Sequence, residues 1–166
     1  MNYVEVEKYD VGMKPHPRFK DQKKLHVGKP LLSAVFDSVS SYMKSTKRAY
    51  PYFNIETKCL PITDNIYHPG PAEFVVIQSF DFRSLQYLHK NYPGIPTAIL
   101  IEDADKTTFE EQLEKLGFTA SIYSPHYSMV NEALVKKCHE KNMKIIPWTI
   151  NDKKEIDNLK AMGVDG

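Results

Sequence analysis

Glu56 and Lys58 are the side chains whose types and spacing suggest chemistry on an anion. They close a run from Tyr52 to Lys58 that alternates like a β-strand. Residues two apart in a strand point the same way, so Asn54, Glu56 and Lys58 share one face. A carboxylate binds a hard cation and an ammonium binds a phosphate oxygen, so the pair suits a metal-bridged anion. An ordinary structural ion pair is the commoner meaning of such spacing.

The composition excludes several classes of protein. The 166 residues are 42% hydrophobic, enough for the core of a domain. Twenty-two Lys and Arg against 21 Asp and Glu leave a formal net charge of +1, so no strong field attracts nucleic acid or an anionic membrane. No apolar run reaches the roughly 20 residues of a membrane span. We expect no nucleic-acid partner and no membrane span.

The start of the chain and its two cysteines say little about the compartment. Met1 opens onto charged sequence without a signal-peptide pattern. Cys59 and Cys138 have neither metal-ligand spacing nor the density of a disulfide scaffold, so we expect free thiols, with Cys138 buried in a helix. The compartment, periplasm or cytoplasm, and the oligomeric state stay open.

From Phe74 onwards, short apolar runs alternate with amphipathic segments. The predicted strands are 74–78, 96–101, 120–123 and 144–149. The predicted helices are 81–91, 107–116, 127–142 and 152–162. Gly117 ends the second helix as a C-cap glycine. The period of roughly 22 to 25 residues is that of parallel βα units.

Such a series builds either a (β/α)₈ TIM barrel or an open doubly wound sheet. No glycine-rich turn of the dinucleotide-binding type follows any strand, which favours the barrel.

Three stretches depart from this alternation. Residues 59–71 form a proline-rich loop where a crossover helix is expected. Residues 162–166 have the pattern of an entry to another strand. Residues 10–29 carry prolines, lysines and glycines, which predicts an excursion over the surface, before an amphipathic helix over 31–44.

Five short runs, in this order and spacing, resemble the glycerophosphodiester phosphodiesterase family. Each run is weak alone, but the combination is specific and covers nearly the whole chain. The runs are Asn54-Ile55-Glu56-Thr57-Lys58, Ile77-Gln78-Ser79-Phe80-Asp81, Pro125-His126, Pro147-Trp148-Thr149-Ile150-Asn151 and Gly163-Val164-Asp165-Gly166.

The resemblance implies a (β/α)₈ barrel that hydrolyses glycerophosphodiesters to an alcohol and glycerol 3-phosphate, an activity of lipid and glycerol metabolism. It implies a divalent metal, Ca²⁺ or Mg²⁺, at the carboxyl ends of the strands, with Glu56 as one metal ligand. Lys58 matches the lysine beside the substrate phosphate, and Trp148 matches an aromatic residue of the substrate pocket. Hard oxygen ligands suit these cations, which neutralise a phosphodiester.

The departures from the family pattern are as informative as the matches. The His-Arg-Gly, Glu-Asn-Thr and second His-Asp motifs of the family do not occur in this sequence, and Glu155-Ile156-Asp157 echoes the Glu-x-Asp metal pair only within the final predicted helix. Both catalytic histidines and two of three metal carboxylates are thus missing, so no residue is assigned a catalytic role. We expect one partial barrel domain over 1–166, with 10–29 as a surface insertion. Its N-terminal strands, one crossover helix and last strand would be missing, and its turnover negligible.

Two further residues are candidates for contact with the substrate. His126 follows a predicted strand at the catalytic end of a barrel, where a substrate-facing role competes with surface exposure. Phe80 shares a face with Gln78 at another strand end, where lining the site competes with core packing. Trp148 is open to the same two interpretations, pocket wall or core aromatic.

Two other functions remain open. One is a degenerate barrel that binds an anion or a protein partner without catalysis. The other is an aldolase-like barrel with Lys58 as a Schiff-base lysine, which needs a depressed lysine pKa that neighbouring Glu56 opposes.

Overall fold

The computed structural model describes residues 2–17, 19–56 and 75–166. Two compact units, Met1–Tyr50 and Pro51–Gly166, are described separately. Lys58 and the expected proline-rich loop at 59–71 lie outside the described residues.

The first unit contains the helices α1 (Tyr3–Val6) and α2 (Leu32–Thr46). The helix α2 confirms the one predicted over 31–44. Between the helices, residues 10–29 are almost all exposed, and the Val11 N–H donates to the Val27 carbonyl at 2.9 Å. Gly12 is required at this crossing, because a Cβ there would lie 2.1 Å from the Leu25 carbonyl oxygen. The status of 10–29 as an insertion in a barrel domain stays a prediction.

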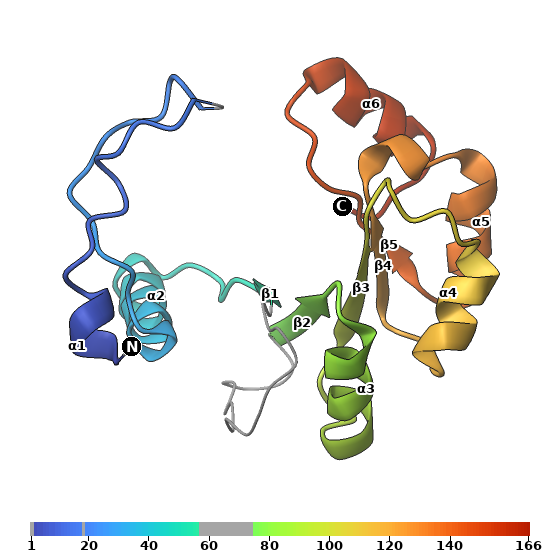
Figure 1. Cartoon of the computed structure of the whole chain (residues 1–166), viewed down its shortest axis with the longest axis horizontal. Helices are drawn as coiled ribbons and strands as arrows, with labels where there is room; N and C mark the ends of the chain where they lie inside the picture. Colours follow the sequence, from blue (N-terminus) through green and yellow to red (C-terminus); the bar gives the residue numbers. More distant parts are fainter. Residues whose placement is uncertain (1, 18, 57–74) are drawn as a thin grey trace. The chain divides into compact units, whose positions relative to one another are not determined.

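The second unit is built on a parallel sheet of five strands (Figure 1). Their order in the sheet is their order in the chain, β1-β2-β3-β4-β5. A doubly wound sheet reverses its strand order at a switch point, whereas a barrel adds strands in sequence. The fold is therefore part of a (β/α)₈ barrel, as predicted. The strands are β1 (Phe53–Glu56), β2 (Val75–Ser79), β3 (Thr97–Ile101), β4 (Ile122–Pro125) and β5 (Lys144–Ile145).

The two faces of this sheet have different surroundings. On one face, Ile99, Ile101, Tyr123 and Ile145 join a buried cluster with the helices, and this cluster includes Cys138 at 0% exposure. We call the opposite face the inner face. The register places one row of inner-face residues across all five strands: Glu56, Gln78, Ala98, Ile122 and Lys144.

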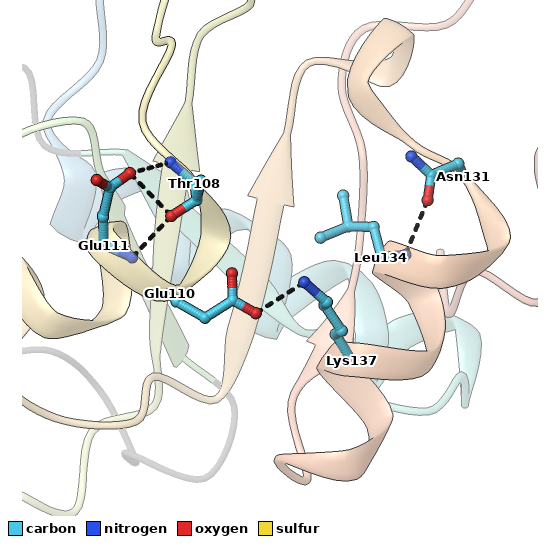
Figure 2. A network of polar contacts seen from close by, with 6 residues as sticks. All are labelled: Thr108, Glu110, Glu111, Asn131, Leu134 and Lys137. Atoms are coloured by element: carbon cyan, nitrogen blue, oxygen red, sulfur yellow. Dashed lines mark hydrogen bonds and ion pairs between the residues drawn. The ribbon is translucent and has the colours of Figure 1, made fainter.

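Four helices follow strands β2 to β5. They are α3 (Phe82–Asn91), α4 (Phe109–Leu116), α5 (Glu132–Glu140) and α6 (Lys153–Ala161). The predicted C-cap of α4 is confirmed, because Gly117 has φ +79° and donates its N–H to the Leu113 carbonyl at 2.9 Å. Figure 2 shows the caps of α4 and α5 and the ion pair between these helices, in which Lys137 Nζ lies 2.8 Å from Glu110 Oε1.

The structure corrects two predicted elements. The helix predicted over 127–142 is divided, since Asn131 caps α5 and a short 3₁₀ helix, η2 (Tyr127–Met129), precedes it. The strand predicted over 144–149 is regular over two residues only, Lys144–Ile145. Its bonding to β4 continues beyond them, since the Ile146 N–H donates to the Tyr123 carbonyl at 3.0 Å and the Trp148 N–H donates to the Pro125 carbonyl at 3.1 Å. Beyond it, Trp148 pairs with His126 in an isolated parallel bridge.

No strand is assigned within residues 162–166, which were predicted as the entry to another strand. Asp165 nevertheless lies beside β5, as an entry to a next strand would: its backbone N–H donates to the Ile145 carbonyl at 2.9 Å, and its Oδ2 accepts the Ile145 N–H at 2.8 Å. Within the described ranges, no helix is long and apolar enough to cross a membrane.

Candidate functional site

The carboxyl ends of the five parallel strands lie at one edge of the sheet, which we call the carboxyl edge. Active sites of barrels are built at this edge. Asn54 Nδ2 donates to Gln78 Oε1 at 2.7 Å across β1 and β2, which confirms that Asn54 lies on the inner face. Glu56 follows two residues later as the half-buried register partner of Gln78. Whether Glu56 meets Lys58 stays a prediction.

Trp148 is held firmly at the carboxyl edge. Its Nε1–H donates to the Ser124 carbonyl at 2.9 Å, and its backbone N–H donates to the Pro125 carbonyl at 3.1 Å. The Trp148 carbonyl in turn accepts the Tyr127 N–H at 2.9 Å. With its only polar side-chain group bonded to β4, the half-buried indole offers apolar surface to its remaining surroundings.

Phe80, His126 and Trp148 form one aromatic cluster. The Phe80 ring meets Trp148 edge-to-face, with centroids 5.5 Å apart and planes at 87°. His126 meets Trp148 in the same manner, at 5.4 Å and 85°. Phe80 is 40% exposed, so core packing does not account for it. The structure brings these three predicted site residues together from the ends of three strands, and we call them the aromatic cluster.

His126 is also bonded to Ser128, a residue that sequence reasoning missed. Ser128 Oγ lies 2.8 Å from His126 Nδ1, and the Ser128 backbone N–H donates to the same atom at 3.4 Å. The backbone of His126 is fixed by its N–H, which donates to the Ile101 carbonyl at 2.8 Å. The spacing His-x-Ser after a strand was the available signal, but a pair two residues apart is too common to single out.

An open hollow of about 680 Å³ lies beside Phe80, between the ends of β2 and β3 and the helices α3 and α4. Two of the acidic side chains that line it, Asp81 and Asp105, are hydrogen-bonded to neighbouring protein groups. Asp81 caps α3 and pairs with Arg83 at 2.9 Å, and this bond lowers the Asp81 pKa. Asp105 bonds the hydroxyl and N–H of Thr107, which lowers its pKa. Because both carboxylates are bonded within the protein, we interpret Asp81 and Asp105 as structural residues.

Among the residues predicted for the site, Glu56 has the donor type that suits a divalent cation. In the parts of the chain that the structure describes, no group of three or more His, Cys, Asp or Glu side chains could hold a metal ion. Hard cations of this kind take six or more oxygen ligands. The described residues therefore do not make a complete metal site.

Comparison with known proteins gives a consistent result. The family model described as the glycerophosphoryl diester phosphodiesterase family matches residues 2–166. A glycerophosphodiester phosphodiesterase of Bacillus altitudinis is 30% identical over 145 residues, which are 82% of this chain and 57% of the relative. The chain spans 37% to 64% of the length of the curated relatives it matches.

Solved structures show the same fold. A crystal structure from Silicibacter pomeroyi DSS-3, provisionally named a glycerophosphoryl diester phosphodiesterase, has a TM-score of 0.79 and 25% identity, and the match covers all of this chain and 63% of that one. A phosphodiesterase of Oleispira antarctica in complex with the product sn-glycerol-3-phosphate has a TM-score of 0.55 and 16% identity, over 99% of this chain and 65% of that one.

Proposed function

Since this chain belongs to the glycerophosphoryl diester phosphodiesterase family, we propose that the protein it represents hydrolyses glycerophosphodiesters to an alcohol and glycerol 3-phosphate. The observation that carries the proposal is the aromatic cluster of Phe80, His126 and Trp148. It lies at the edge of the sheet where barrel enzymes bind substrate. The product named for the Oleispira antarctica phosphodiesterase supports the same substrate class.

In this proposal the described residues bind and orient the diester. Trp148 and Phe80 supply an apolar wall for the carbon skeleton beside the phosphate, because the indole N–H is already bonded to Ser124. His126 donates a hydrogen bond to a phosphate oxygen. Lys58, which lies outside the described residues, is proposed to neutralise a second phosphate oxygen.

Metal dependence is a further part of the proposal. Glu56 would supply one oxygen ligand to Ca²⁺ or Mg²⁺, and a bound cation of this kind neutralises charge on the phosphodiester. The described residues provide no complete ligand set, so further ligands must come from outside them. We propose that this chain by itself has negligible turnover.

The test is the release of glycerol 3-phosphate from glycerophosphocholine in the presence of Ca²⁺ or Mg²⁺. The gene product that contains this chain with any segments encoded beside it should be active, and E56Q should lower its rate by at least about tenfold because a metal ligand is lost. E132Q makes the same acid-to-amide change at an exposed position of α5 and should leave the rate unchanged.

Two results would contradict these proposals. If the whole gene product released no glycerol 3-phosphate from any glycerophosphodiester with either cation, the hydrolase assignment would fail. A non-catalytic barrel that binds an anion or a protein partner would then be the better account. If the 166-residue chain alone turned over like the whole gene product, the proposed inactivity would be wrong.

A further inference from the structure

The bonds to Ser128 determine which ring nitrogen of His126 carries the proton. A backbone N–H can only donate, so the Ser128 amide requires a lone pair on His126 Nδ1. The Ser128 hydroxyl, 2.8 Å from the same atom, then donates as well. A neutral imidazole carries one proton, so in His126 that proton lies on Nε2, at the opposite edge of the ring from Ser128.

The backbone holds this pair of residues in place from both sides. His126 is the N-cap residue of η2, whose turn is closed by the Met129 N–H bonded to the His126 carbonyl at 3.0 Å. Tyr127, between them, donates its N–H to the Trp148 carbonyl at 2.9 Å. The imidazole is further confined by the Trp148 ring and by the Tyr127 ring, whose centroid lies 4.6 Å away.

We propose that Ser128 is a positioning residue: it fixes His126 as the Nε2–H tautomer, so that His126 presents a hydrogen-bond donor at the carboxyl edge to a phosphate oxygen of the diester. The oxygens of a phosphodiester only accept hydrogen bonds, so the other tautomer would turn a lone pair towards them and repel them. The identity of the ligand rests on the proposed function, whereas the tautomer rests only on the bonds to Ser128. No described residue occupies Nε2, which leaves that donor available.

The substitution S128A removes the hydroxyl and keeps the weaker backbone donor. Loss of one hydrogen bond in the bound state should weaken the binding of glycerol 3-phosphate roughly five- to tenfold. S128T keeps a hydroxyl at the same position and should behave like the unchanged chain. S121A removes a hydroxyl from an exposed serine at the other end of β4 and should change neither binding nor the tautomer.

The experiment is nitrogen-15 NMR of the His126 ring at a pH where the imidazole is neutral. The chemical shifts and two-bond couplings of the ring nitrogens distinguish the tautomers directly, and H126Q assigns the signals by removing them. We expect the Nε2–H form in the unchanged chain and in S128T, and a mixture of both tautomers in S128A. Titration with glycerol 3-phosphate and Mg²⁺ should then shift the Nε2 signal.

Each other outcome overturns the inference. A proton on Nδ1 in the unchanged chain, or S128A with the same tautomer and affinity, would show that Ser128 positions nothing. In the second case, continued binding next to Phe80 and Trp148 would leave the proposed function standing. If the unchanged chain had the Nε2–H tautomer but glycerol 3-phosphate shifted no signal at the carboxyl edge, the donor role would be wrong, and the proposed function would lose its support as well.

Discussion

Replacing Tyr123 with phenylalanine removes one hydroxyl from beneath the strand end that carries His126. Tyr123 Oη donates to Gln112 Oε1 at 2.6 Å, and both side chains are 1% exposed. Gln112 Nε2 is bonded on its other side to the Thr107 carbonyl at 3.1 Å, so the amide cannot turn to find another donor. The edge-to-face contact of Tyr123 with Phe109, at 5.0 Å between centroids, is kept by the substitution.

We expect Y123F to lower the free energy of unfolding by about 1–3 kcal/mol, because the Gln112 oxygen stays buried without a donor. At roughly 2–4 °C per kcal/mol for a chain of this length, Tm should fall by about 2–12 °C in thermal unfolding followed by circular dichroism. The double variant Y123F/Q112L removes both polar partners and should lose less than the sum of the single changes. Y87F, at a tyrosine that is 61% exposed, is the control without effect. An unchanged Tm in Y123F, or strict additivity in the cycle, would refute the reasoning.

Three further predictions concern caps and charges. T108A breaks the capping box with Glu111 and should lower the stability of the chain by about 1 kcal/mol, while T108S keeps it; equal Tm values for the two would exclude the cap as a contributor. Burial by itself would raise the pKa of Asp165, but hydrogen bonds from the Ile145 amide and His139 hold this pKa below its ordinary value. The Asp165 carboxylate therefore stabilises the folded chain above the pKa that it has in the unfolded chain, and this stabilisation is lost as the pH falls through its pKa in the folded chain. D165N should therefore flatten the acid limb of the profile of Tm against pH, and a profile like that of the unchanged chain would count against this. Burial raises the pKa of Cys138 to about 12. The folded chain therefore loses stability as the pH rises above the ordinary pKa of a thiol, because unfolding then allows Cys138 to ionise. In a C59A background, iodoacetamide should modify Cys138 only as fast as the chain unfolds, and rapid modification of the folded chain would contradict its burial.

The helices could be predicted from the sequence because each has one apolar face, and most strands because each is a short apolar run. The errors arose where local polar bonds override that pattern. Asn131 caps α5 and delays its start, although apolar residues continue the helical spacing before it. Regular pairing of β5 stops at Ile145, although the apolar run and the bonds to β4 continue as far as Trp148.

The residues of the aromatic cluster could be predicted individually because each follows a strand, and parallel strands bring their carboxyl ends together. The positions of these side chains relative to one another could not be predicted, because they depend on the hydrogen-bond partner of each side chain. Trp148 bonds the Ser124 carbonyl, which no sequence pattern indicates, and His126 bonds Ser128, for which the only signal is a His-x-Ser spacing that is too common to single out.

The central claim is that the carboxyl edge of the sheet forms part of a binding site for a glycerophosphodiester. Trp148 offers the most direct test of this claim. Trp148 is the single tryptophan of the 166 residues, so the intrinsic tryptophan fluorescence of the chain reports on the aromatic cluster alone. Titration with glycerol 3-phosphate and Mg²⁺ should give a saturable change in that fluorescence, and sulfate at equal ionic strength should not. No saturable change, or the same change with sulfate, would contradict the claim.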